Sequence, residues 1–140
     1  GQKLTNKIGE DSYSILPIFK GEKLHDLSRG GIVHHSDAGK FSIRKGQWKL
    51  VLATGGGTRR QNPKDEPVIN PADIELFDME NDAGELTNVQ HLHPKIVEEL
   101  KKLLAKYIDD GRSTDGSIQT NEPGKRWEQL EVLEGYVKKY

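Results

Sequence analysis

The stretch from Phe41 to Val51 constrains the fold of this chain more than any other part of its sequence. Apolar and polar residues alternate on both sides of Lys45-Gly46, a pair that favours a turn. Successive side chains of a strand point to opposite faces of a sheet. After the turn, the expected apolar face holds Trp48, Leu50 and Leu52, and the opposite face holds Lys49 and Val51. The stretch therefore predicts two paired strands with one apolar face.

Further segments add strands and one helix. Residues 31–36 are a strand candidate that forms a hairpin with residues 41–45, the third strand runs from 47 to 54, and residues 74–79 form a fourth. The clearest element is a helix from Pro94 to about Asp109, whose apolar residues recur every three or four positions and which Gly111 ends. A helix with one apolar stripe needs a sheet face to cover, so the sequence predicts an α+β domain.

The composition excludes several classes of partner and chemistry. The 21 basic and 22 acidic residues are interspersed and give a net charge of −1, so no basic field is available to bind nucleic acid. No apolar run approaches the roughly 20 residues of a membrane-spanning helix. The chain has no cysteine, which excludes disulfides, zinc–thiolate sites and a thiol nucleophile. The absence of cysteine fits a protein of a reducing compartment or a bacterial periplasmic protein without disulfide bonds.

The segment His34-His35-Ser36 is the best candidate for function that the residues offer. Adjacent strand residues point to opposite faces, so at most one histidine should face the buried side of the sheet. The other is free to reach solvent, a neighbouring domain or an anion. Two consecutive histidines without a third ligand do not make a metal site. One exposed and one half-buried histidine at a strand end is an equally good interpretation.

Other polar segments favour structural roles. Residues 55–71 form a long polar loop whose Gly55-Gly56-Gly57-Thr58-Arg59-Arg60 end has the groups to cradle an anion, although a hairpin tip explains it better. Asp82, followed three residues later by Glu85, is typical of a capping box at the start of a short helical turn. No Gly-x-Ser-x-Gly elbow and no Ser/His/Asp trio is identifiable by spacing. We therefore assign no catalytic residue and no metal ligand to this chain.

Several segments, taken in order, resemble the C-terminal part of type I sulfatases, the formylglycine-dependent, arylsulfatase-like family. The resemblance spans Asp11 to Gly116. The matching pieces are Asp11 to Pro17 with Gly21 ("D-x-x-S-L-L-P-x-L-x-G"), Phe41 to Leu50 (which contains "R-x-G-x-W-K-L"), Leu76-Phe77-Asp78, Asp82 to Asn88, His93-Pro94, and Gly111 to Gly116 ("G-R-S-T-P-G"). The sequence departs from the family at Ala83 and Asp115, where the family usually has proline. No single piece is specific to the family, and the resemblance rests on the order in which the pieces occur along the chain.

The resemblance implies a four-stranded antiparallel sheet packed against one long helix, with a C-terminal extension. Residues 1–23 would close the missing catalytic domain, 24–116 would form the C-terminal domain, and 117–140 would be an extension with some helix. It also implies that the formylglycine nucleophile, made within a "[C/S]-x-[P/A]-x-R" motif, and the calcium ion belong to the missing catalytic domain. By position, His34, His35 and Ser36 would line the rim of its pocket for a sulfated glycan or aryl sulfate.

Two functional interpretations follow, from different classes. One is the supporting C-terminal domain of a sulfatase, which is a sulfuric ester hydrolase. The partner of this domain would be the catalytic domain of the same protein. The family implies a location in the bacterial periplasm or outside the cell. That interpretation predicts an exposed apolar patch where the catalytic domain docks. The alternative is a stand-alone carbohydrate-binding or protein-interaction module with a polar sheet surface. Self-association of the isolated domain through the apolar patch is a third, weaker interpretation.

Overall fold

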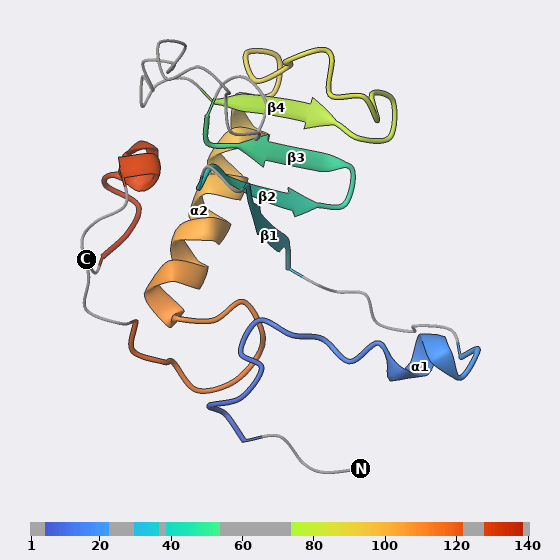
Figure 1. The fold of residues 1–140 in the computed structure, drawn as a ribbon. Helices are drawn as coiled ribbons and strands as arrows, with labels where there is room; N and C mark the ends of the chain where they lie inside the picture. Colours follow the sequence, from blue (N-terminus) through green and yellow to red (C-terminus); the bar gives the residue numbers. More distant parts are fainter. Residues whose placement is uncertain (1–4, 23–29, 37–38, 54–73, 122–127, 139–140) are drawn as a thin grey trace, which may run out of the picture.

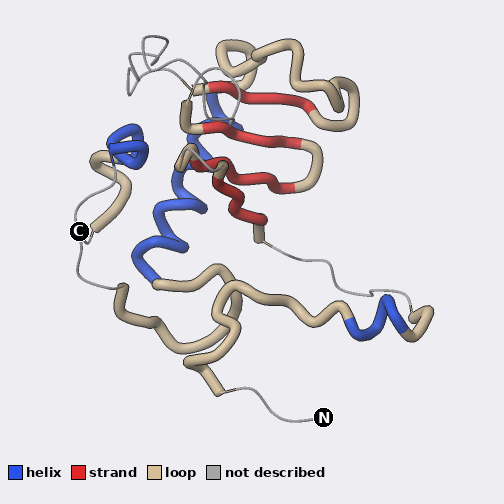
Figure 2. Tube along the Cα trace, in the orientation of Figure 1, coloured by secondary structure: helices blue, strands red, loops and turns tan. Residues whose placement is uncertain are grey.

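The computed structural model describes residues 5–22, 30–36, 39–53, 74–121 and 128–138. Within these residues, a sheet of four strands lies against one long helix, α2, with a short helix, α1, away from that body (Figures 1 and 2). The strands are β1 (Ile32–His35), β2 (Phe41–Lys45), β3 (Trp48–Val51) and β4 (Glu75–Asp78). The helices are α1 (Leu16–Phe19), α2 (Pro94–Asp110) and the 3-10 helix η2 (Glu128–Leu133). The α+β prediction is confirmed.

The sheet is an antiparallel meander in the order β1-β2-β3-β4. Gly46, with φ of 59°, forms the turn between β2 and β3, as the Lys45-Gly46 pair predicts. The register aligns Val33, Ile43, Leu50 and Leu76 across all four strands, and this row belongs to the core. The next row, His34, Ser42, Val51 and Glu75, faces the other way.

Helix α2 covers one face of the sheet and leaves the other face uncovered by helix (Figure 1). Its buried side chains Leu100 and Leu104 join the strand residues in one core cluster. Gly111 ends the helix with φ of 62°, as predicted, because a side chain disfavours this left-handed conformation. None of the helices in the described residues is long and apolar enough to cross a bilayer.

The C-terminal segment, residues 128–138, packs onto the same core. Leu130 and Leu133 of η2 are both buried in the core cluster. The segment is also attached to α2 by polar contacts, because Asp109 accepts a hydrogen bond from the backbone N–H of Lys138 at 2.9 Å and Glu98 accepts one from the Tyr136 hydroxyl. Asp109 therefore has a structural role at the end of α2.

We expect Tyr136→Phe to loosen the C-terminal segment in a pH-dependent way. The hydrogen bond from Tyr136 lowers the pKa of Glu98, and the same bond raises the pKa of Tyr136. A carboxyl group whose pKa is lowered in the folded state stabilises the fold above its usual pKa of 4.5. A phenol whose pKa is raised stabilises the fold below its usual pKa of 10.0. The contact therefore contributes to stability between these two pH values. Hydrogen exchange at Val137 and Lys138 should accelerate in the variant at neutral pH, and the difference should shrink well below pH 4.5.

Tyr13→Phe is the matched control, because the Tyr13 hydroxyl bonds elsewhere, to the carbonyl of Ser113 at 3.2 Å. If Tyr13→Phe and Tyr136→Phe affected exchange at Val137 equally, the Glu98 contact would not be what holds the segment.

The N-terminal arm, residues 10–13, is tied to the turn that follows α2. Asp11 accepts the backbone N–H of Ser113 at 2.8 Å, and the Thr114 hydroxyl donates to the carbonyl of Glu10. The turn itself is organised by Arg112, which is only 8% exposed and donates to the carbonyls of Thr114 at 2.9 Å and Ser117 at 3.0 Å. A guanidinium, not the small polar side chains of this turn, therefore holds its two ends together.

Helix α1 leaves the body and has no buried residue (Figure 1). Pro17 lies in its first turn, where a proline favours the helix. The apolar side chains in and beside α1 are exposed: Ile15 by 49%, Leu16 by 56%, Ile18 by 53% and Phe19 by 78%. They form a local group of exposed apolar side chains, which we call the α1 patch.

Candidate functional site

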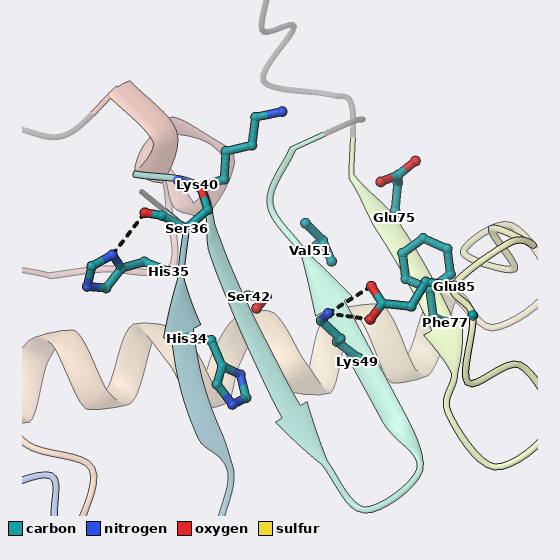
Figure 3. Close-up of a pocket in the computed structure, with 11 residues that line it drawn as sticks. His34, His35, Ser36, Lys40, Ser42, Lys49, Val51, Glu75, Phe77 and Glu85 are labelled. Carbon is teal, nitrogen blue, oxygen red and sulfur yellow. Dashed lines mark hydrogen bonds and ion pairs between the residues drawn. The ribbon is translucent and has the colours of Figure 1, made fainter. Parts of the chain in front are cut away.

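The two histidines of β1 point to opposite sides of the sheet, as strand alternation predicts. His34 lies on the face opposite α2, in register with Ser42 of β2 (Figure 3). His35 lies on the helix side, where its ring is 5.8 Å from that of Phe41 and its Nδ1 donates to the carbonyl of Ser36 at 3.1 Å. Both are exposed. Ser36 accepts the backbone N–H of Lys40 at 3.2 Å, which closes the turn after β1.

A pocket of about 540 Å³ lies on the sheet face that α2 leaves uncovered. We call it the outer-face pocket. Its lining combines two cationic and two anionic side chains with hydroxyl, imidazole and apolar groups (Figure 3). The lining residues are His34, His35, Ser36, Lys40, Ser42, Lys49, Val51, Glu75, Phe77, Gly84 and Glu85. All three residues of the predicted site thus border one pocket, although His34 and His35 reach it from different sides of β1.

An ion pair between Lys49 and Glu85 lies in this pocket. Lys49 Nζ is 2.6 and 2.7 Å from the two carboxylate oxygens of Glu85 (Figure 3). The two side chains are 23% and 32% exposed, so the pair is partly shielded but still accessible to a ligand. An ammonium and a carboxylate at contact distance offer donors and acceptors side by side.

The turn at residues 82–87 holds Glu85 over the sheet. The carboxylate of Asp82 accepts the backbone N–H groups of Leu86 and Thr87, each at 2.8 Å. Asp82 therefore caps as predicted, but residues 82–88 form turns and not the expected start of a helix. Glu85 does not complete a capping box, because its carboxylate binds Lys49 of β3. The capping pattern is thus wrong for Glu85, whose partner is 36 positions away in the chain.

Lys49 and Glu85 are two of the lining residues that the sequence analysis did not propose for the site. Alternation along β3 correctly puts Lys49 on the face opposite Leu50, and that was the one available signal. Residues 55–60, which the sequence analysis interprets as a hairpin tip with an anion cradle as the alternative, and the loop predicted at 55–71 lie outside the described residues. A second pocket, of about 450 Å³, lies between the N-terminal arm, β1 and the C-terminal half of α2, and His35 borders this one as well.

The described residues contain no cluster of three or more His, Asp or Glu side chains that could hold a metal ion. The calcium ion that the sulfatase resemblance implies therefore has no fitting ligand set in this part of the chain. The outer-face pocket can bind a ligand through hydrogen bonds and charge.

Among solved structures, this chain is similar to a sulfatase of Bacteroides thetaiotaomicron, designated 6S-sulf and described in connection with the metabolism of multiple glycosaminoglycans. The TM-score is 0.55 and the sequence identity 28%, over 75% of this chain and 21% of that one. No family model matches the chain, and no curated protein matches it. The chain thus has a sulfatase-like fold and is a sulfatase-related domain that spans about one fifth of its structural neighbour.

Proposed function

We propose that this chain is the C-terminal domain of a sulfatase, in which it supports the catalytic domain and lines the rim of the substrate pocket. The observation that carries the proposal is the similarity to the 6S-sulf sulfatase, because 28% identity accompanies a shared fold over three quarters of this chain. The formylglycine nucleophile and calcium would come from the catalytic domain. The intact protein would hydrolyse a sulfate ester, with calcium supplying charge stabilisation.

The α1 patch supports this proposal over a free-standing module. Four apolar side chains in and beside one helical turn are each about half exposed or more, and a single turn is not stable on its own in water. Such a segment is expected to be covered in the working protein. A catalytic domain that precedes this one in the same polypeptide would bring an apolar surface to it.

The relation to a glycosaminoglycan-metabolising neighbour makes a sulfated glycan the first substrate to assay, with an aryl sulfate as the second. We place His34 at the rim as a donor to a sulfate oxygen or sugar hydroxyl, with His35 and Ser36 shaping the end of β1. Secretion to the periplasm or the exterior goes with this proposal.

The test uses the complete protein encoded by the reading frame that contains this sequence. We expect a "[C/S]-x-[P/A]-x-R" motif upstream, and sulfate release from a 6-O-sulfated glycosaminoglycan disaccharide. His34→Ala should lower kcat/KM by roughly 10- to 100-fold, the loss of one charge-assisted hydrogen bond in the transition state. His35→Ala should have a smaller effect, since the ring contacts Phe41 on the helix side.

Lys102→Met is the control, because Lys102 pairs with Glu98 at 3.0 Å on α2, far from β1 in sequence. A reading frame without the motif, or a complete protein that releases no sulfate from either substrate class, would contradict the proposal. In that case the alternative of a binding module takes its place.

A further inference from the structure

We propose that the outer-face pocket is a saccharide subsite, in which the Lys49–Glu85 pair binds sugar hydroxyls and His34 meets an anionic substituent of the same sugar. The inference gives a binding role to two residues outside the strand-end segment. It rests on the proposed function in one respect, namely the expectation that the anionic substituent is a sulfate. The geometry of the pocket suits a sulfate and a carboxylate equally.

The Lys49–Glu85 pair has unused hydrogen-bonding capacity. An ammonium has three N–H donors and a carboxylate about four lone-pair sites, so their mutual contact leaves groups on both partners. With Nζ at 2.6 and 2.7 Å from the two oxygens, the remaining donor and acceptor positions are adjacent in space. Neighbouring hydroxyl groups on a sugar ring, each both donor and acceptor, match such a pair. The pair carries no net charge, so it selects hydroxyls and not anions.

The backbone at Glu85 supports a functional role for its side chain. Glu85 has φ of 54°, and it is the only non-glycine residue with positive φ in the part of the chain that the structure describes. This conformation is disfavoured for a residue with a Cβ. Gly84 lies directly before it, yet the left-handed position itself holds a glutamate, aimed at Lys49. Strained residues that present a side chain to a pocket cluster at functional sites.

The rest of the lining fits a sugar. Val51 lies beside Lys49 on the same face and gives apolar surface for the C–H groups of a ring (Figure 3). Phe77 also borders the pocket, but at 4% exposure it adds little to that surface. A volume of about 540 Å³ lies within the range of small-molecule sites.

His34 supplies the donor for the anionic substituent. The His34 side chain makes no hydrogen bond, ion pair or ring contact with the described residues, and it is exposed on the pocket side of β1 (Figure 3). An imidazole N–H donates to a sulfate or carboxylate oxygen, and the bond strengthens if the ring is protonated. One strand, β2, separates His34 from Lys49, and the two are offset by two residues along the strands, so their backbones lie about 12 Å apart. With both side chains turned to the same face, a sugar ring with its substituent spans that distance.

The experiment is a titration of this chain with monosaccharides, followed by backbone and side-chain NMR shifts. The probes are glucosamine 6-sulfate, glucuronate and neutral N-acetylglucosamine. We expect saturable shifts at His34, Ser42 and Lys49 with the anionic sugars, with a Kd on the order of 1 mM. Lys49→Met should weaken binding of all three sugars about tenfold, because the hydroxyl contacts are lost. His34→Ala should weaken the anionic sugars alone and bring them to the level of the neutral one.

Lys102→Met is the matched control, since it removes another ion-paired lysine from a different surface. Sulfated and carboxylated sugars are compared directly, so the titration itself shows which anion the pocket prefers. Unsaturated shifts with every probe, or equal effects of Lys49→Met and Lys102→Met, would overturn the inference. His34→Ala changes an exposed side chain and tests the site even if Lys49→Met fails to fold.

The two proposals fail separately. Sulfate release by the complete protein with no sugar binding at the outer-face pocket would leave the proposed function standing and remove the subsite. Sugar binding by this chain together with a complete protein that releases no sulfate would do the reverse.

Discussion

Leu133→Ala is expected to destabilise the fold by about 2–5 kcal/mol, the range for truncating a buried leucine. Leu133 is 0% exposed and belongs to the core cluster formed by the sheet and α2. Its removal would leave a cavity between η2 and the rest of the core, which the neighbouring backbone fills only in part. Urea unfolding of the purified chain, followed by circular dichroism, measures the loss as a lowered midpoint at an unchanged slope.

Leu86→Ala is the matched control for this prediction. Leu86 is 88% exposed, so the same change of atoms should alter stability by no more than about 0.5 kcal/mol. Equal effects of the two variants would mean that η2 does not share the core and that residues 128–138 are an independent appendage. The comparison therefore measures how far the C-terminal segment belongs to the domain.

The sheet and α2 could be predicted because their signals are local. The alternation around Lys45-Gly46 determines which side chains of β3 face the core, and the structure confirms this with Leu50 at 0% exposure. The helix ends within one residue of its predicted end, because Gly111 is the residue that suits a left-handed cap. Short connections then make neighbouring strands antiparallel partners.

The role of η2 could not be predicted with the same clarity. Its two core residues, Leu130 and Leu133, are three positions apart in a six-residue 3-10 helix. That is too short a pattern to distinguish an apolar face from chance. The burial of η2 depends on a surface left free by α2 and the sheet, and such a surface has no signature in the sequence of the segment itself.

The part of the site on β1 could be predicted from the sequence as well as the strand itself. Alternation separates His34 from His35, and the structure confirms the separation. The Lys49–Glu85 contact joins β3 to a turn 36 positions away and depends on a positive φ at a glutamate. Neither the distance nor the conformation follows from local propensity, which favours glycine or asparagine there. A pocket built from segments that are distant in the sequence therefore cannot be predicted before the fold is known.

Arg112→Met is expected to destabilise the chain by at least about 2 kcal/mol, since hydrogen bonds from charged donors contribute about 1.5–3 kcal/mol each. Arg112 is 8% exposed and donates to the carbonyls of Thr114 and Ser117 and to the Thr114 hydroxyl at 2.9 to 3.0 Å. Methionine fills much of the volume but donates to none of these acceptors, and among the described residues only the Ser117 carbonyl keeps another donor, the Gln119 side-chain amide at 2.9 Å. Thermal unfolding measures the total loss.

The same variant should release the N-terminal arm, because Ser113 and Thr114 are the residues to which the arm is bonded. Proteolysis within residues 10–22 should accelerate before the core unfolds. Arg112→Lys should behave almost as Arg112→Met does, since one ammonium cannot reproduce the planar fork of donors. Arg44→Lys is the control: Arg44 is exposed, and its Nε donates to the carbonyl of Gly46 at 3.1 Å, so it should change stability little. If Arg112→Lys retained full stability and an intact arm, charge alone would suffice at this position, and the geometry of the guanidinium would not be what joins the arm, the turn and the end of α2.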